Sequence, residues 1–389
     1  MLDYESLLSE RVKVVKPSGI RKFFDYAATM EDVISLGVGE PDFETPWQIR
    51  RAGIQSLEKG KTFYTSNWGL ADLRREIAGL AQRRYGLSYS PDKEILVTVG
   101  GSEGIDNAIR ALVSFGDEVL IPEPSFVCYT PLAVMAGGVP VPLPTYEKDE
   151  FKLTPENLRA AITPRTKLLV LPFPNNPTGA IMTREELEGI AAVLRDTNVV
   201  VISDEIYCSL TYGTERHVCF AELPGMRERT IVIDGFSKSY AMTGWRLGWA
   251  MGPRELMTQI CKLHQFGIMC APTTAQFAGI EAIRSCDEEV VHMRRQYDTR
   301  RRFLVSELRD IGLRCFEPRG AFYVFPRIPD CGLTSEEFCS RLLMEQRVAV
   351  VPGSAFGESG EGHVRISYSY SMNHLREACH RLRAFLKTL

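Results

Sequence analysis

A lysine and an arginine follow an apolar, β-type run in the segment IVIDGFSKSYAMTGWRLGW, residues 231–249. The apolar run ends at Asp234-Gly235, Lys238 comes shortly afterwards, and Arg246 follows eight residues after the lysine. A solitary lysine behind a strand is usually a solvated charge. This lysine lies among small and apolar residues, which can lower the pKa of its amine and make it a nucleophile toward carbonyl groups. An arginine nearby would then serve as an anion clamp beside that amine.

Glycines or polar residues stand at the ends of several other apolar runs, or within them. These segments are VISLGVGE (33–40), EILVTVGGSEG (94–104), PFPNNPTG (172–179), VVVISDEIY (199–207) and HVRISYS (363–369). A glycine lets the backbone come close to a ligand, and the N–H groups of a turn that opens a helix form an anion site. A carboxylate at the carboxyl end of a parallel strand, such as Asp204, is well placed to meet a ligand. Taken alone, each segment is also typical of an ordinary turn between two elements.

The string SKSYAMTGWRLGW (237–249) resembles the coenzyme-lysine segment of the fold-type I, class I/II aminotransferases, which use pyridoxal 5′-phosphate (PLP). The other motifs of that family recur here in the family's order over nearly the whole chain. The resemblance implies an aminotransferase of the branch that holds aspartate, aromatic and N-acetyl-diaminopimelate enzymes. It also implies a ping-pong transfer of the amino group of an L-amino acid to a 2-oxo acid such as 2-oxoglutarate.

The same resemblance implies roles for the residues around the coenzyme ring. Lys238 would hold PLP as a Schiff base and later move a proton between the substrate and the coenzyme. Asp204 would pair with the pyridine nitrogen and keep it protonated, while Tyr207 would hydrogen-bond the ring hydroxyl O3′. Asn176 would contact both O3′ and a substrate carboxylate, and Phe126 would stack on the ring.

The implied phosphate and carboxylate contacts complete the site. The phosphate would be bound by Gly101, Ser102, Glu103, Ser237 and Arg246, and by Tyr64 from the neighbouring subunit of a homodimer. Because an ionised carboxylate repels a phosphate, we expect the backbone of Glu103 to face the phosphate and its side chain to point elsewhere. Gly39 and Arg365 would bind the substrate α-carboxylate, through a backbone N–H and a bidentate guanidinium respectively. Some relatives carry a hydroxyl residue in place of Gly235. In this chain, the hydroxyl contact to the phosphate would be made by Ser237 instead.

Apolar runs alternate with helix-type segments from about residue 45 to residue 285. This repetition predicts an α/β fold with three layers, built on a doubly wound and mostly parallel sheet. A long helical region at 275–312 then leads to a smaller α+β domain. We expect an N-terminal arm with part of the small domain at 1–44, a large PLP-binding domain at 45–285, and the C-terminal small domain at 286–389.

Two of the expected helices have clear start signals. A helix over 45–59 is expected to have Thr45 as its N-cap and Pro46 in its first helical position. A second helix, over 183–196, begins with the capping-box pair Thr183 and Glu186.

Composition narrows the class of protein further. The chain has 389 residues, of which 44% are hydrophobic and 24% charged, and its formal net charge is −3. These values predict a globular protein and give no electrostatic reason to expect a nucleic-acid partner. No apolar run approaches the ~20 residues of a membrane helix, and MLDYESLLSERVK lacks the apolar core of a signal peptide. Ten cysteines without a C-x-x-C pair suggest reduced thiols, so we expect a cytoplasmic protein without a bound metal or membrane contact.

Two alternatives use the same motifs. A β-eliminating C–S lyase of the same fold needs the same lysine and aspartate and differs only in its reaction. A PLP-sensing regulator would bind the coenzyme without catalysis, but we expect segment 1–44 to be too short for the DNA-binding domain that such proteins carry. The motifs do not identify the preferred amino donor. A dicarboxylate substrate would need a second cation, for which Arg21 and Lys22 are candidates.

Overall fold

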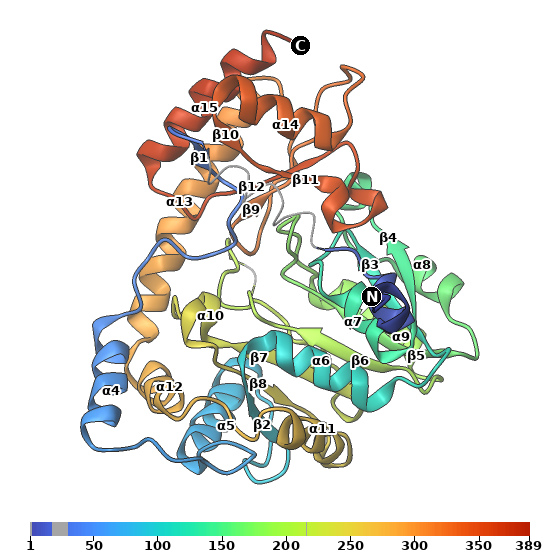
Figure 1. The fold of residues 1–389 in the computed structure, drawn as a ribbon, viewed down its shortest axis with the longest axis vertical. Coiled ribbons are helices and arrows are strands. Elements are labelled where there is room, and N and C mark those ends of the chain that lie inside the picture. The colour runs from blue at the N-terminus through green and yellow to red at the C-terminus, as the bar shows by residue number, and fades with distance from the viewer. Residues whose placement is uncertain (1, 18–29, 215) are drawn as a thin grey trace.

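The computed structural model describes residues 2–17, 30–214 and 216–389. A seven-stranded sheet forms the centre of the larger part of the molecule (Figure 1). In their order across the sheet, its strands are β2 (Ile95–Thr98), β8 (Gly248–Met251), β7 (Thr230–Gly235), β6 (Val200–Asp204), β5 (Thr166–Leu171), β3 (Glu118–Glu123) and β4 (Val139–Pro144). Neighbouring strands are parallel except where β8 pairs with β2 and β7. The mostly parallel sheet predicted from the sequence is therefore confirmed.

Helices cover both faces of this sheet. One face packs against α6 (Gly100–Leu112), α7 (Tyr129–Ala136) and α11 (Arg254–Gly267). The other face packs against α5 (Ala71–Tyr85), α9 (Arg184–Leu194) and α12 (Thr273–Ser285), with α4 (Trp47–Glu58) on α12 and α8 (Pro155–Ala161) on α9. Successive strand residues alternate between the two cores: Val201 is buried with Leu187, and Ile202 with Ile105. The three layers expected of a doubly wound fold are present.

The start of one helix follows its local signal, whereas the start of another does not. α9 begins with the capping box of Thr183 and Glu186, as predicted. α4 begins at Trp47, with Pro46 in the cap position rather than inside the helix. The hydroxyl of Thr45 donates to the carbonyl of Ala241 at 2.5 Å instead of capping the helix. The expected N-cap was wrong because a contact distant in sequence outweighs the local capping preference.

Two small sheets form the centre of the other part of the molecule. β1 (Ile34–Ser35) pairs in parallel with β10 (Val348–Ala349), and β12 (Val364–Ser367) lies antiparallel between β11 (Val351–Pro352) and β9 (Tyr323–Val324). The helix α13 (Asp287–Asp310) follows α12 in the chain and contacts α15 (Met372–Leu386). α15 also packs against α14 (Ser335–Gln346) (Figure 1). Two short helices, α1 (Tyr4–Leu7) and α2 (Glu10–Lys13), lie near the N-terminus. The division of the chain at residues 44 and 285 stays a prediction.

Several strand ends meet at one edge of the large sheet. β2, β5, β6 and β7 run in the same direction, so their carboxyl ends share this edge. β7 continues directly into the short helix α10 (Phe236–Ser239), and β2 leads into α6. Because Gly235 of β7 is paired with Gly248 of the antiparallel β8, segment 236–247 is a loop that is closed at its base.

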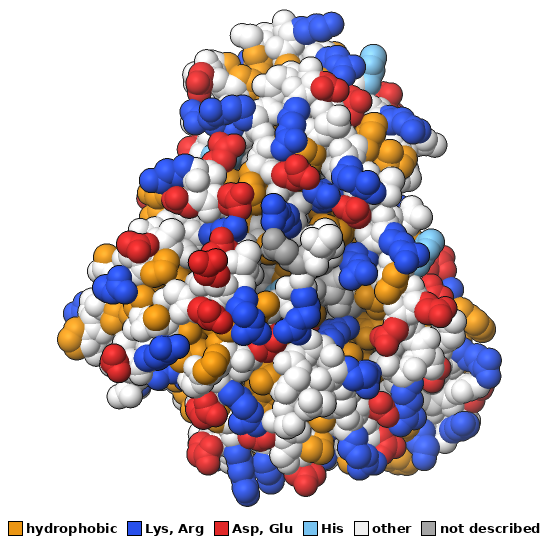
Figure 2. Space-filling view, turned by 180° about the vertical axis from the view of Figure 1, so that it is seen from behind, with side chains coloured by type: hydrophobic (Ala, Val, Ile, Leu, Met, Phe, Trp, Pro, Cys, Tyr) orange, Lys and Arg blue, Asp and Glu red, His pale blue; other side chains and the backbone are white. Residues whose placement is uncertain are grey.

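The surface carries both signs of charge. Basic and acidic side chains are interspersed over the face shown in Figure 2. Among the helices that the structure describes, none combines the length and the apolar character needed to cross a membrane. All ten cysteines are free thiols, and most of them are buried.

Candidate active site

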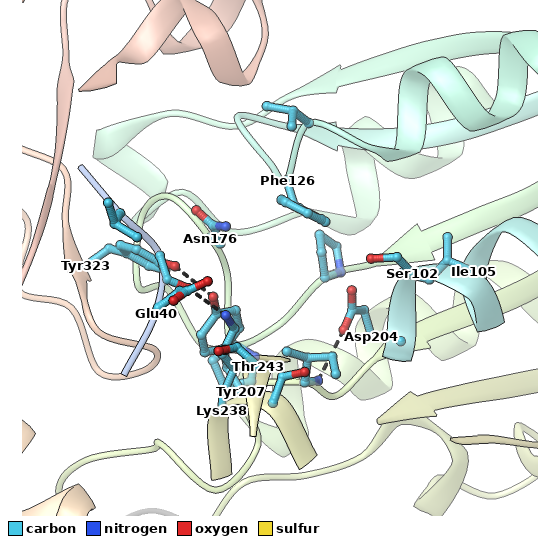
Figure 3. Close-up of a pocket in the computed structure, with 18 of the residues that line it drawn as sticks. Glu40, Ser102, Ile105, Phe126, Asn176, Asp204, Tyr207, Lys238, Thr243 and Tyr323 are labelled. Atoms are coloured by element: carbon cyan, nitrogen blue, oxygen red, sulfur yellow. Dashed lines mark hydrogen bonds between the residues drawn. The ribbon is translucent and has the colours of Figure 1, made fainter. Parts of the chain in front are cut away.

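A cavity of about 950 Å³ lies at this edge of the sheet and is lined by residues from both parts of the molecule. Figure 3 shows Ser102 and Asp204 toward one end, Tyr323 and Glu40 toward the other, and Lys238 between them. The predicted site residues that line the cavity are Gly39, Gly101, Ser102, Phe126, Asn176, Asp204, Tyr207, Ser237, Lys238, Arg246 and Arg365. The structure therefore brings together nearly all of the residues singled out from the sequence.

Lys238 stands in α10, immediately beyond the carboxyl end of β7. Its Nζ donates a hydrogen bond to the carbonyl of Gly39 at 2.5 Å. Burial lowers the pKa of this amine to about 8; the charge of Glu40 acts against that shift, and those of Arg365 and Arg246 act with it. The neutral form of the amine, which a nucleophile or a base requires, is therefore reached closer to neutral pH than in an ordinary lysine.

Asp204 ends β6 as a buried carboxylate that faces the cavity (Figure 3). Its Oδ2 accepts a hydrogen bond from the hydroxyl of Tyr129 at 2.6 Å, and its Oδ1 accepts one from the N–H of Ile206 at 3.1 Å. Burial raises the pKa of Asp204 to about 6, although both hydrogen bonds act in the opposite direction. No cationic side chain of the described residues is paired with it. A buried carboxylate without a cationic partner from the protein is suited to pair with a cationic group of a ligand.

Arg246 and the first turn of α6 form an anion-binding end of the cavity. Arg246 has a left-handed backbone, with φ of 51°, and its Nη1 donates to the carbonyl of Thr243 at 2.9 Å. A Cβ at Gly100 would lie 2.7 Å from the guanidinium, so the glycine allows the arginine to lie against the helix start. The hydroxyl residues Ser102 and Ser237 line the same region. A guanidinium beside the unpaired N–H groups of a helix N-terminus is suited to a phosphate dianion.

The side chain of Glu103 points away from this anion-binding end. Its Oε2 accepts from the N–H of Val99 at 2.5 Å, and its Oε1 accepts from Nδ2 of Asn107 at 2.8 Å. The same Oε1 lies 2.7 Å from Nδ1 of the buried His264. The carboxylate is thus held by the interior of the protein, as expected from its repulsion of a phosphate.

Arg365 lies in β12 and is only 3% exposed. Its Nη1 donates to Oδ1 of Asn176 at 2.9 Å, and its Nη2 donates to the carbonyl of Gly37. The guanidinium lies 4.5 Å from the centre of the Tyr323 ring, and its Nε has no hydrogen-bond partner among the described residues. Because none of these partners carries a negative charge, the guanidinium fits the carboxylate of a ligand.

Two site residues were missed by sequence reasoning. Tyr129 holds the carboxylate of Asp204, and the hydroxyl of Tyr323 lies 2.8 Å from that of Tyr207. A Cβ at Gly39 would lie 2.5 Å from the Tyr323 hydroxyl, so this ring packs directly against the glycine. The spacing of Tyr129 three residues after Phe126 was a possible signal, since both face the cavity across the start of α7.

Tyr64 does not line the cavity of its own chain. It lies in the loop before α5 and is 80% exposed, next to Phe63, which is equally exposed. Its contact with the neighbouring subunit's phosphate stays a prediction. Arg21 and Lys22, the candidates for a second cation, lie outside the described residues.

Known proteins resemble this chain over almost its whole length. The profile of the family Aminotransferase class I and II matches residues 31–382. The putative aminotransferase YugH of Bacillus subtilis is 52% identical over 98% of both chains, and an aspartate aminotransferase of Pyrococcus abyssi is 45% identical, again over 98% of both. The crystal structure of an aromatic aminotransferase from Pyrococcus horikoshii matches with a TM-score of 0.90 at 44% identity, over 94% of this chain and 99% of that one. The chain therefore belongs to the class I and II aminotransferases, enzymes whose cofactor is pyridoxal phosphate.

Proposed function

We propose that this aminotransferase moves the amino group of an L-amino acid, of the aspartate or aromatic type, to a 2-oxo acid such as 2-oxoglutarate in a ping-pong reaction. The observation that carries the proposal is the placing of Lys238, Asp204 and Arg365 around one cavity, with none of the three in an ion pair with another described residue. The names of the aspartate and aromatic relatives support the choice of substrate type.

The chemistry of the cavity fits pyridoxal phosphate at three points. Asp204 offers a negative charge to the ring nitrogen, Lys238 offers an amine to the aldehyde, and Arg246 with the start of α6 offers a site for the phosphate. A volume of about 950 Å³ lies within the range of small-molecule sites and leaves room for an amino acid beside the cofactor.

Three residues would carry the chemistry. When bound, pyridoxal phosphate supplies a ring system that stabilises negative charge at the substrate Cα. Asp204 keeps the ring nitrogen protonated, because a cation beside this buried carboxylate relieves the cost of its charge. Tyr129 fixes the position of that carboxylate through its hydrogen bond. Lys238 would hold the cofactor through its aldehyde, and its amine would serve as the base that carries the proton of the substrate Cα.

The remaining residues would position the two ligands. Arg365 would bind the substrate α-carboxylate, with its guanidinium oriented by Asn176. Gly39 would present its backbone N–H to the same carboxylate, Phe126 would lie against the ring, and Tyr207 would hydrogen-bond the ring hydroxyl. The phosphate would be held by Gly101, Ser102, the backbone of Glu103, Ser237 and Arg246. Positioning of this kind can contribute as much as about 7–11 kcal/mol for ideal geometry.

The Lys238→Ala variant tests the cofactor attachment and the catalytic role together. The wild type should be yellow with bound cofactor, whereas the variant should lose the absorbance of the lysine-bound form and its turnover. Lys262→Ala, which changes an exposed lysine of α11, should retain both. A wild type that remains colourless after incubation with pyridoxal phosphate would overturn the assignment, as would normal turnover by Lys238→Ala.

Initial rates with a panel of amino donors test the substrate class and the kinetic order. With 2-oxoglutarate as acceptor, L-aspartate or an aromatic amino acid should be the best donor, and double-reciprocal plots should give parallel lines. Intersecting lines would contradict a ping-pong reaction. Release of pyruvate and ammonia from a cysteine conjugate without an oxo acid would instead indicate a C–S lyase.

We also propose that the active unit is a homodimer in which Tyr64 donates its hydroxyl to the phosphate of the other subunit's cofactor. Support comes from the exposure of this residue and from a second exposed aromatic, Phe266, which is 85% exposed. Tyr64→Phe should weaken retention of the cofactor without changing the mass measured by light scattering. Tyr146→Phe, at another exposed tyrosine, serves as the control. A monomeric mass for the active enzyme would contradict the proposal.

A further inference from the structure

A second cavity, of about 720 Å³, lies between the end of α5, the segment that follows β6, and the first half of α13. It shares no lining residue with the active cavity. Along the segment that leaves β6, Asp204, Ile206 and Tyr207 line the active cavity, whereas Cys208 and Ser209 line the second one. The second cavity is therefore a separate feature of the fold rather than an extension of the cofactor site.

Arginine dominates the lining of this second cavity. The arginines are Arg83, Arg84, Arg216, Arg294, Arg295 and Arg302. The acidic residues of the described lining are Asp287 and Asp298, so the lining has six arginines and two carboxylates, and Asp234 and Glu222 outside the lining compensate two of the arginines. The whole chain has a formal net charge of −3, and the face in Figure 2 mixes both signs. The positive charge is therefore concentrated at the cavity and does not follow from the average composition.

Three of these arginines have no acidic partner among the described residues. Arg83 lies near the end of α5, and Arg294 and Arg295 lie on α13, so the unpaired charges reach the cavity from two separate helices. Like charges that are held around one hollow repel each other, and a bound anion would remove that cost. All three side chains are exposed, so their guanidinium groups are accessible to a ligand that enters the cavity from solvent.

The other three arginines are engaged with the protein itself. Nη1 of Arg84 lies 3.4 Å from Oδ2 of Asp234, and Nη2 of Arg302 lies 3.3 Å from Oδ2 of Asp298. Arg216 is paired with Glu222. These pairs engage three of the arginines and leave Arg83, Arg294 and Arg295 as the groups available to a ligand.

Part of the cavity lining is formed by buried aliphatic, aromatic and thiol side chains. These residues are Leu80, Tyr85, Cys208 and Tyr212. A ligand with a carbon skeleton could lie on this part of the lining while its charged groups meet the arginines. Guanidinium groups bind phosphate and carboxylate with matching planar geometry, and the volume lies within the range of small-molecule sites.

We propose that this cavity is a second ligand site, which binds a small organic polyanion with at least two carboxylate or phosphate groups. Arg83 binds the anion from α5, and Arg294 and Arg295 bind it from α13. The site does not depend on the cofactor phosphate, which belongs to the active cavity. Nor does it depend on the proposed choice of amino donor.

Calorimetric titration of the cofactor-loaded enzyme tests this proposal, with citrate and pyrophosphate as the two probes. The loaded enzyme is used because its phosphate site is already filled. We expect saturable binding of one equivalent per chain for at least one probe. Tighter binding of citrate would assign the site to polycarboxylates, and tighter binding of pyrophosphate would assign it to phosphorylated compounds. Absence of saturable binding of both probes would overturn the proposal.

A matched pair of double variants locates the binding. Arg294→Ala with Arg295→Ala should weaken binding by roughly tenfold or more, because two charge-assisted contacts are lost. Arg159→Ala with Arg254→Ala removes the same charge from exposed positions on α8 and α11, outside both cavities, and should bind as the wild type does. Both double variants should retain transamination, which shows that they are folded. Equal affinity in the two double variants would overturn the assignment to this cavity.

Discussion

Asp204 and Asp234 stand at the carboxyl ends of neighbouring strands, β6 and β7, yet their environments differ. Both are buried, and burial raises the pKa of Asp204 to about 6 and that of Asp234 to about 7. Asp204 faces the active cavity and accepts a hydrogen bond from Tyr129, without a cationic partner among the described residues. Asp234 faces the other way, toward the guanidinium of Arg84 at 3.4 Å.

The difference between the two carboxylates is in what compensates their charge. The protein supplies Asp234 with its own cation, so that residue serves the structure. Asp204 has no such cation among the described residues, which agrees with its proposed pairing with the cofactor. Burial and a raised pKa are common to both and do not identify a functional group by themselves. A buried charge that faces a cavity without an internal partner is the more specific sign of a binding position.

Replacing Asp204 should have the largest effect on catalysis. Asp204→Asn keeps the shape of the side chain and the acceptor for the Ile206 N–H, but it removes the charge that we propose keeps the ring nitrogen protonated. We expect kcat/KM to fall by about 10²- to 10³-fold, in the range found when one preorganised electrostatic contact is removed. Steady-state kinetics at saturating cofactor measure the loss. A fall of less than about threefold would place Asp204 with Asp234 as a structural residue.

Arg365 extends the same comparison from carboxylates to guanidinium groups. It is buried without an acidic partner among the described residues, whereas Arg84 is paired with Asp234. Arg365→Leu should raise KM for amino acids and oxo acids alike by about 10- to 100-fold, the equivalent of one lost charge-assisted contact. The affinity for the cofactor, measured by equilibrium dialysis, should stay unchanged. An unaltered KM would remove this residue from the substrate site.

The pH dependence of stability gives a sharper test of the unpaired carboxylate. The pKa of Asp204 is raised to about 6 in the folded cofactor-free protein, above the ~3.9 of an unfolded chain. The stability that its protonated form contributes is therefore fully present below about pH 4 and is lost as the pH rises through 6. Relative to Asp204→Asn, the cofactor-free wild type should lose about 2–3 kcal/mol of unfolding free energy between pH 4 and 7.

Urea unfolding of both proteins at a series of pH values measures this loss. Loading with the cofactor should abolish it, because in our proposal the ring nitrogen then pairs with the carboxylate. A pH profile that is the same with and without cofactor would argue against that pairing.

Arg84 should show the smallest effect of the series, and on stability alone. Arg84→Met keeps most of the volume but leaves Asp234 buried without its cation, which raises the pKa of that carboxyl further. Because the cost appears only when Asp234 ionises, we expect a loss of about 1–2 kcal/mol at pH 8 and little loss at pH 5. Urea unfolding of the loaded enzyme at both pH values tests this. An equal loss at pH 5 and pH 8 would show that the contribution of Arg84 is packing rather than charge.

The contrast between these two carboxylates also shows which features of the site could be predicted from the sequence and which could not. The apolar runs before Asp204 and Lys238 predicted two strands, and parallel strands bring their carboxyl ends to one edge; the structure confirms both steps. The sequence offered no way to tell Asp204 from Asp234, since each follows an apolar run. Arg84, which makes the difference, is 150 residues away from Asp234.

Other side-chain contacts of the site could not be predicted either, because their partners are also distant in the sequence. The hydroxyl of Tyr129 meets a carboxylate 75 residues away, and Tyr207 and Tyr323 are separated by 116 residues. Local patterns report the period and the ends of elements, whereas these partners are set by the packing of one element on another. The arginines of the second cavity come from three separate segments and show no motif of their own.

The loop between Gly235 and Gly248 carries both Lys238 and Arg246 and is held at its base by the pairing of the two glycines. A Cβ at Gly248 would lie 2.8 Å from the backbone nitrogen of Gly101, so this base is also pressed against the start of α6. An insertion within the loop would therefore shift the amine of Lys238 and the guanidinium of Arg246 together.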